Sequence, residues 1–267
     1  MAKKYHLPVK LGIKGRAKTA FLAVSDSVVA GRRSRMIVIL TGAGISQESG
    51  ISTFRDTGGL WENERIEDVG TPGGFARNPE KVLDFHNRLR KQLLSPKIAP
   101  NPAHIALARL ERESREPVLV VTQNVDNLHE RAGTKNLLHM HGELCKIRCN
   151  ACSMVMLWET DMNMHDVCPE CSKVGRLRPH IVWFEEMPFY MDEIGHALSK
   201  CRLFVSIGTS GNVYPAAGFV RLARQVGADT LELNMERSQG ADFFHRGRYG
   251  KAGTVVPAWV EEVLAGK

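Results

Sequence analysis

Residues 36–55 read MIVILTGAGISQESGISTFR and decide the fold of the chain. The six residues from Met36 to Thr41 are mostly apolar and rich in β-branched side chains, which predicts a short buried strand. Gly42-Ala43-Gly44 follows directly. Glycines at the end of a strand allow a sharp turn and let phosphate approach backbone N–H groups. A third glycine of the dinucleotide fingerprint is replaced by Gln47, so an ordinary strand-to-helix turn is the alternative.

Further apolar runs along the chain end in glycine or polar residues, as the strands of nucleotide-binding α/β folds do. We predict strands over 117–122, 137–140, 201–208 and 230–234. Helices are expected over 79–94, from 101, from 213 and over 257–264, with loops over 56–80 and 248–252. The alternation predicts an α/β protein with a Rossmann-like, doubly wound parallel sheet.

Two CxxC pairs form the most specific motif in the sequence. Cys149 and Cys152 are separated from Cys168 and Cys171 by fifteen residues. This spacing brings four thiolates around one Zn²⁺ with tetrahedral geometry. Four protein ligands close the coordination shell, so we expect a structural zinc that activates no water. We therefore predict a zinc-ribbon lobe over 145–177, inserted between segments 36–144 and 178–267 of the nucleotide-binding domain.

The positive charge of the chain is concentrated at its N-terminus. Of a net charge of +7 over 267 residues, residues 1–35 contribute nine Lys or Arg and one Asp, that is +8, and the remainder −1. Charge confined to one end describes a tail and not a nucleic-acid groove. The tail has two interpretations, an organellar targeting peptide or a solvated extension preceding a start at Met36.

The remaining composition sets the expected environment. No apolar run reaches the ~18 residues that a spanning helix needs, so we expect a soluble chain with no membrane partner. Six cysteines without an export signal indicate a reducing compartment, and we expect a cytoplasmic location. Cys145 and Cys201, which lie outside the zinc motif, are expected to be buried thiols.

Further motifs occur in a recognisable order: Gln123-Asn124-Val125-Asp126, His139-Met140-His141-Gly142-Glu143, Gly208-Thr209-Ser210 and Glu232-Leu233-Asn234. With the glycine turn and the CxxC pairs, they make residues 36–252 resemble the sirtuin family of NAD-dependent protein-lysine deacylases. The resemblance is to bacterial members related to the desuccinylase-like branch. It implies NAD as co-substrate, one structural zinc and acyl-lysine proteins as substrates, with no nucleic-acid partner expected.

The resemblance also implies roles for individual residues. His141 would be the general base on the cofactor ribose, although a lone histidine is more often structural and sequence alone does not separate His141 from His139. His139 is then expected only to pack. The implied cofactor-binding residues are Gly42, Ala43, Gly44, Ile45, Ser46, Thr53, Phe54, Arg55, Trp61, Gln123, Asn124, Asp126, Gly208, Thr209, Ser210, Asn234, Met235, Glu236 and Ala252. The implied substrate-binding residues are Thr57, His86, Leu89, Val182, Trp183 and Phe184.

The sequence departs from the desuccinylase-like pattern where the acyl group would bind. That branch carries an alanine in the loop and a Tyr-x-x-Arg pair on the following helix, where this chain has Thr57, His86 and Leu89. Leu89 cannot form the charge-assisted hydrogen bonds that an acyl carboxylate needs. We therefore expect neutral acyl groups to be favoured over succinyl and malonyl. A one-residue shift that lets Arg88 or Arg90 bind the carboxylate is the alternative.

Three other functions compete with deacylation. Mono-ADP-ribosyl transfer would use the same fold and cofactor. A hydride-transfer dehydrogenase would use the same glycine turn, but the missing third glycine and the zinc motif argue against it. A zinc-ribbon nucleic-acid-binding protein is suggested by the basic tail, but it leaves the phosphate-turn motifs without a role. Glu185, which stands where sirtuins usually have glycine after the aromatic pair, is a further departure beside the expected peptide site.

Overall fold

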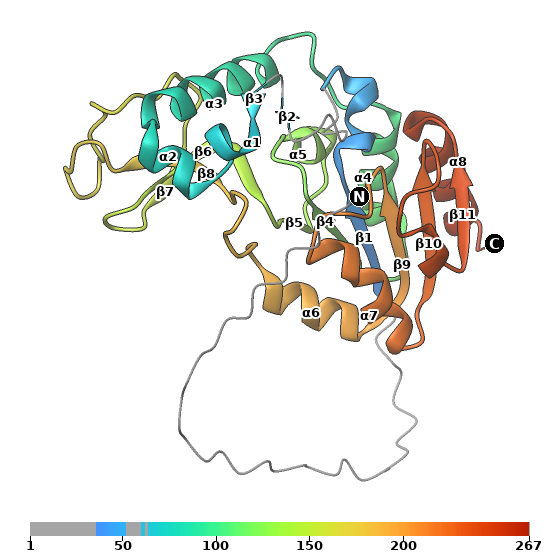
Figure 1. Cartoon of the computed structure of the whole chain (residues 1–267). Helices are drawn as coiled ribbons and strands as arrows, with labels where there is room; N and C mark the ends of the chain where they lie inside the picture. The colour runs from blue at the N-terminus through green and yellow to red at the C-terminus, as the bar shows by residue number, and fades with distance from the viewer. Residues whose placement is uncertain (1–35, 52–59, 62–63, 267) are drawn as a thin grey trace, which may run out of the picture. The chain divides into compact units, whose positions relative to one another are not determined.

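A six-stranded parallel sheet forms the main body of the protein (Figure 1). The computed structural model describes residues 36–51, 60–61 and 64–266, without the side chains of Leu60 and Trp61. The strand order is β11-β10-β9-β1-β4-β5, and every neighbouring pair is parallel. The order reverses beside β1, so the carboxyl ends of β1 and β9 form the topological switch point. The strands are β1 (Met36–Thr41), β4 (Val118–Thr122), β5 (Leu137–His139), β9 (Cys201–Ile207), β10 (Asp229–Asn234) and β11 (Arg246–Tyr249).

Helices cover both faces of this sheet, because successive strand residues point to opposite sides. Ile37 and Ile39 of β1 pack in one apolar cluster with residues of α4 (Pro102–Glu113) and α8 (Ala252–Leu264). Val38 and Leu40 pack in a second cluster with α6 (Met191–Ser199) and α7 (Phe219–Gln225). The predicted doubly wound, Rossmann-like fold is confirmed.

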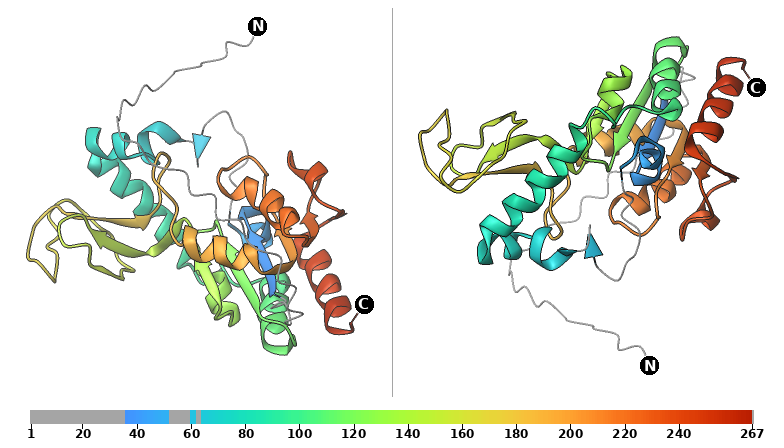
Figure 2. Two further views of the ribbon diagram at one scale, coloured as in Figure 1. Left: turned by 90° about the horizontal axis from the view of Figure 1, so that it is seen from below. Right: turned by 90° about the horizontal axis from the view of Figure 1, so that it is seen from above.

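A smaller antiparallel sheet lies beside the parallel one (Figure 2). Its strand order is β7-β6-β8, with β6 (Gly142–Cys149), β7 (Val155–Leu157) and β8 (Leu177–Ile181). The segment that forms it runs from Gly142 to Ile181, beyond the 145–177 that the sequence predicts for a lobe, and carries both CxxC pairs. The longest helix of the described chain, α3 (Pro79–Leu93), packs against β6 and β8.

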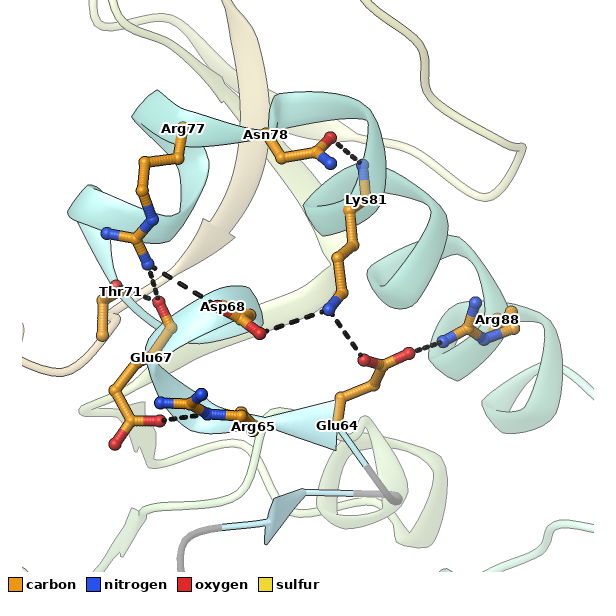
Figure 3. Close-up of polar contacts among 9 residues, drawn as sticks. All are labelled: Glu64, Arg65, Glu67, Asp68, Thr71, Arg77, Asn78, Lys81 and Arg88. Carbon is orange, nitrogen blue, oxygen red and sulfur yellow. Dashed lines mark hydrogen bonds and ion pairs between the residues drawn. The ribbon is translucent and has the colours of Figure 1, made fainter.

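An ion-pair network joins α3 to the segment that precedes it (Figure 3). Glu64 of β3 (Glu64–Arg65) accepts from Lys81 at 3.1 Å and from Arg88 at 3.3 Å. Lys81 also reaches Asp68 of α1 (Ile66–Val69) at 3.3 Å. All of these side chains are at least partly exposed, so each pair adds little by itself, but together they set the position of β3 and α1 on α3.

The expected loop over 56–80 is wrong for the part that the structure describes. Besides β3 and α1 it contains α2 (Pro72–Arg77) and β2 (Leu60–Trp61). Thr71 is the N-cap of α2 and its Oγ1 accepts from the N–H of Gly74 at 2.9 Å, while Pro72 is the first helical residue. This capping signal is visible in the sequence but is weakened by the two glycines that follow it.

Three expected boundaries in the C-terminal part of the chain are also wrong. The expected loop over 248–252 includes the end of β11, a short polar edge strand without an apolar pattern. Helix α8 begins at Ala252, five residues before the predicted start at Pro257, which lies inside the helix. The helix expected from 213 begins as the 3₁₀ turn η3 (Ala216–Gly218) before α7.

The remaining helix is α5 (Leu128–Ala132), and three further 3₁₀ turns are η1 (Ala43–Ile45), η2 (Gln47–Ser49) and η4 (Ala241–Phe243).

Candidate functional site

Two glycine turns meet at the switch point of the parallel sheet. The N–H of Gly42 donates to Ile207 O at 3.0 Å, and that of Gly44 to Gly208 O at 2.9 Å. A Cβ on Gly44 would lie 2.7 Å from the Cα of Gly208, and one on Gly208 would lie 2.4 Å from the N of Ile45. Gly208 also has a φ of +62°, which favours glycine. The turn after β1 and the turn after β9 therefore pack backbone to backbone.

A cleft of about 760 Å³ opens beside these turns, within the ~300–1,000 Å³ typical of small-molecule sites. It is bordered by the ends of β1, β4, β9 and β10 together with residues that follow β8. The predicted residues that line it are Gly42, Ala43, Gly44, Leu89, Gln123, Asn124, Asp126, His141, Val182, Trp183, Phe184, Gly208, Thr209, Ser210, Asn234, Met235, Glu236 and Ala252. Residues distant in sequence are thus brought to one cavity.

His141 lies between the two sheets, after β5 and immediately before β6. Its Nδ1 is 3.1 Å from the carbonyl oxygen of Gln123, which can only accept, so Nδ1 carries the proton. The Nε2 lone pair is then available, because His141 lines the cleft. Burial lowers the pKa of His141 and the hydrogen bond to Gln123 opposes this only in part. The neutral, basic form therefore dominates at pH 7.

A buried polar network supports the cleft from behind. Ser46 is fully buried, donates to Asp126 Oδ2 at 2.9 Å and accepts from Asn124 Nδ2 at 3.1 Å. His104 lies behind Ser46, with Nε2 3.4 Å from its hydroxyl, and burial lowers its pKa to about 4. Asp126 also accepts from the N–H of Leu128, the first residue of α5, through Oδ1, so it both anchors the start of that helix and lines the cleft. Sequence reasoning missed His104, for which no spacing rule exists.

His139 does more than pack. Its Nδ1 donates to the carbonyl oxygen of Asn124 at 3.1 Å, and its Nε2 is 2.8 Å from Glu130 Oε1. Burial alone would lower the pKa of His139, but the hydrogen bond with Glu130 outweighs it and the net pKa is raised. His139 therefore positions the backbone of Asn124, which lines the cleft, whereas His141 faces the cleft itself.

The end of the cleft near α3 is mostly apolar, with Gln92 as the one polar side chain among the α3 residues that line it. Leu89 lines it together with Leu93, Leu144, Ile181 and Trp183. His86 is not a lining residue: it is fully buried, its Nδ1 donates to Val82 O at 2.8 Å, and its Nε2 is 3.5 Å from Trp183 Nε1. Burial lowers the pKa of His86 to about 4, so it is neutral.

Neither arginine beside Leu89 faces this end of the cleft. Arg88 is exposed and pairs with Glu64. Arg90 is buried and donates from Nε to Leu144 O at 3.0 Å and from a terminal nitrogen to Asn87 Oδ1 at 2.8 Å. Both guanidinium groups are thus engaged outside the cleft, and neither residue lines it.

A tight turn follows β8 at the mouth of the cleft. The N–H of Glu186 donates to Trp183 O at 3.1 Å, and Glu185 has a φ of +75°, the features of a type II turn. Glu186 is clamped: Arg178 donates to it at 2.6 and 3.0 Å, and the N–H of Trp183 donates to it at 2.8 Å. A non-glycine residue at the left-handed position of Glu185 costs roughly 1–2 kcal/mol.

The four motif cysteines converge at the end of β6 and in the segments that connect the strands of the small sheet. Their Sγ atoms lie within 4.8 Å of one another, and the Cys149–Cys171 and Cys152–Cys168 pairs are each 3.7 Å apart. Zn–S bonds of ~2.3 Å in a tetrahedron require sulfur separations of about 3.8 Å. The donor set therefore fits one structural zinc ion, as predicted.

Sequence comparisons extend this picture. A sequence model of the Sir2 family matches residues 42–215. An NAD-dependent protein deacylase of Pasteurella multocida is 59% identical over 228 residues, which are 85% of this chain and 97% of that protein. The NAD-dependent protein deacylase SIR2rp3 of Leishmania major is 58% identical, over 86% and 96% of the two chains. The chain belongs to the Sir2 family. The predicted family and enzyme class are confirmed, whereas the desuccinylase-like branch stays a prediction.

Solved Sir2 structures share the fold described above. A crystal structure of a Sir2 homologue in complex with NAD has a TM-score of 0.79 and 36% identity, covering 87% of this chain and 91% of the other. Sir2Af2 bound to a myristoylated histone peptide has a TM-score of 0.67 and 32% identity, covering 86% and 92%. The NAD complex agrees with the predicted cofactor, and the glycine turns and the cleft of this Sir2 chain fit a dinucleotide.

Not every predicted residue of this Sir2 chain can be placed at the described cleft. Ile45 is buried beneath the glycine turn, next to Ser46. Thr53, Phe54, Arg55 and Thr57 lie outside the described residues, as does the side chain of Trp61. In the other direction, sequence reasoning missed lining residues such as Gln92, which shares a face of α3 with Leu89 and follows it by three residues.

Proposed function

We propose that this Sir2-family chain is an NAD-dependent protein-lysine deacylase that favours neutral acyl groups, releasing nicotinamide and O-acyl-ADP-ribose. NAD supplies the ribose carbon and hydroxyl to which the acyl group is transferred. The cofactor would lie along the turns after β1, β4, β9 and β10, and acyl-lysine would enter beside Val182, Trp183 and Phe184. The geometry of His141 is the observation that carries the proposal. Its imidazole is neutral, its Nδ1–H donates to the carbonyl oxygen of Gln123, and its unprotonated Nε2 is available to accept a proton in the cleft.

The apolar end of the cleft supports the acyl preference. A succinyl or malonyl carboxylate needs a cation or several N–H donors when it is taken out of water. Leu89 offers neither, Gln92 offers only one uncharged amide, and Arg88 and Arg90 are engaged elsewhere. His86 is buried behind Trp183 and neutral. Acetyl and longer aliphatic groups fit these surroundings because they need no charged partner.

A peptide panel tests the proposal. One peptide sequence carrying acetyl-, butyryl-, octanoyl- or succinyl-lysine is incubated with NAD⁺, and products are identified by mass spectrometry. We expect nicotinamide release with the neutral acyl groups and little with succinyl. Desuccinylation faster than deacetylation would contradict the acyl preference. ADP-ribose retained on a protein, with no free lysine, would instead show mono-ADP-ribosyl transfer.

An engineered carboxylate site sharpens the test. The double change His86→Tyr with Leu89→Arg, and Leu89→Arg alone, should raise desuccinylation relative to deacetylation by roughly 1.5–3 kcal/mol, the worth of a charged hydrogen bond. The matched control is Leu94→Arg, because Leu94 is exposed at the end of α3 and does not line the cleft. An equal rise in the control would show a general charge effect and not an acyl pocket.

The cellular location stays a prediction drawn from the six cysteines. Within the described residues, no helix combines the length and the hydropathy that crossing a bilayer requires. The nature of residues 1–35 and the domain bounds predicted above likewise remain proposals.

A further inference from the structure

Glu185 lines the cleft in a backbone conformation that residues other than glycine seldom adopt. It is one of four non-glycine residues with positive φ in the described chain, and it is exposed while lining the cleft. Among the described residues, its carboxylate has no hydrogen-bond or ion-pair partner. A side chain held in a strained backbone conformation at a cleft suggests a role in binding.

Hydrogen bonds made by the residues next to Glu185 fix the position of its backbone at the mouth of the cleft. Glu186 is clamped by Arg178, whose guanidinium lies 3.4 Å from the ring centroid of Trp183. The N–H of Val182 donates to His141 O at 2.9 Å, and that of Phe184 to Gly70 O at 2.9 Å. The turn is thus anchored on both sides, three residues from the contact with His141. Glu185 therefore belongs to the catalytic end of the cleft and not to the distant end formed by β10.

The charge of the described cleft lining agrees with this position. Acidic residues outnumber basic ones, since the lining contains Glu48, Asp126, Glu185, Glu186 and Glu236 against Arg237. Glu186 pairs with both Arg178 and Arg148, and Arg237 pairs with Asp242 at 2.6 Å. At the catalytic end Glu185 is left as an exposed negative charge, which attracts cations from solution.

From these observations we infer that Glu185 selects protein segments in which the acyl-lysine is flanked by Lys or Arg. The inference rests on the proposed deacylase function, because it concerns residues on either side of the lysine whose acyl group is removed. A flanking cation within reach of Glu185 gains a screened ion pair in the bound complex, whereas a flanking acid is repelled. The contact is remote from the reacting atoms, so it acts on substrate binding and appears in KM more than in kcat.

The experiment uses the full chain with two acetyl-lysine peptides of equal length, one flanked by Lys and Arg and the other by Glu. The ratio of their kcat/KM values is measured at low and high salt. Wild type should prefer the basic peptide by about two- to five-fold at low salt, through KM, and less at high salt. Glu185→Gln should bring the ratio close to one, and Glu185→Lys should invert it.

Two further variants separate a specific contact from general effects. Glu185→Gly removes the side chain while supplying the residue that the turn favours, so it folds and should abolish the preference as Glu185→Gln does. Glu80→Gln removes one exposed carboxylate from α3 outside the cleft and should leave the ratio unchanged. Equal rates for both peptides in wild type, or an equal loss of preference in Glu80→Gln, would overturn the inference while leaving deacylation intact. Failure of both peptides to release nicotinamide would overturn the proposed function, and the inference with it.

Discussion

The two sheets of this protein are stabilised by different means. All five residues of β4 in the parallel sheet are buried, and helices cover both of its faces with apolar side chains. All three residues of β7 in the antiparallel sheet are exposed. The small sheet has a smaller apolar cluster, in which Ile147 and Leu177 pack with Leu83 of α3, and it relies in addition on the four thiols and on polar anchors such as Glu186 and Arg90. Loss of an apolar contact weakens a core by degrees, whereas loss of a ligand or an ion-pair partner removes a cross-link outright.

Removing one zinc ligand should have the largest effect and would test this contrast directly. Cys168→Ala should lower the zinc content below one per chain and cost several kcal/mol in unfolding, because structural zinc contributes folding free energy of order 10 kcal/mol. Zinc content by elemental analysis and thermal unfolding measure both. Cys201→Ala, at a buried thiol of β9, is the matched control and should keep its zinc with a loss of about 1–2 kcal/mol. Full zinc and unchanged unfolding in Cys168→Ala would refute the structural role.

His141 lies at the seam between the sheets and should affect catalysis without affecting either sheet. His141→Gln removes the general base and should lower kcat/KM by roughly 10²–10⁴-fold, with an unchanged melting temperature. Burial lowers the pKa of His141 below its ordinary value of 6.5, so the basic form persists at pH 6.5 and wild-type activity should fall only at lower pH, as the imidazole is protonated. A pH–rate profile checks this. A profile that already falls above pH 6.5 would exclude His141 as the group responsible.

Glu186 should show a smaller, purely electrostatic effect on the small sheet. Glu186→Gln weakens the clamp on the buried Arg178 and should cost about 1–3 kcal/mol in unfolding, whereas Glu80→Gln should cost little. Burial alone would raise the pKa of Glu186, but the hydrogen bonds from Arg178 and Trp183 outweigh it and the net pKa lies below 4.5. The stabilisation is therefore present above pH 4.5 and lost as the pH falls through the lowered pKa. Chemical denaturation at pH 7 and below pH 4 checks this; an equal difference between variant and wild type at both would contradict it.

The parallel sheet could be predicted from the sequence because each of its central strands is a short apolar run followed by glycine or polar residues. Burial on both faces leaves few other interpretations of a run such as Val118–Thr122. The zinc site was predictable because metal geometry restricts spacing. Strand β11 was not, because a short edge strand needs no apolar pattern when only its backbone pairs.

The polar residues of the site also include some that the sequence predicts and some that it does not. Gln123, Asn124, Asp126 and His141 could be predicted because they follow strand ends, where parallel sheets bind ligands. The residues that support them could not be predicted. His104 contacts Ser46 across 58 residues of sequence, and His139 hydrogen-bonds to the backbone carbonyl of Asn124. Contacts of this kind depend on tertiary packing and leave no periodicity. The burial of His86 likewise could not be predicted, because it depends on Trp183, which is distant in sequence, packing beside it.

The backbone-to-backbone packing of Gly42, Gly44 and Gly208 limits how this site can be redesigned. Any side chain at one of the three positions displaces main-chain atoms of the opposite turn, since there is no flexible neighbour to move aside. Attempts to retune the enzyme toward a modified nucleotide by directed evolution therefore have no single-step route through these turns. Accessible variation lies with residues whose side chains already occupy the cleft wall, such as Gln123, Met235 and Ser210. Because the two glycine turns pack backbone to backbone, they keep their positions while other residues that line the cleft are varied.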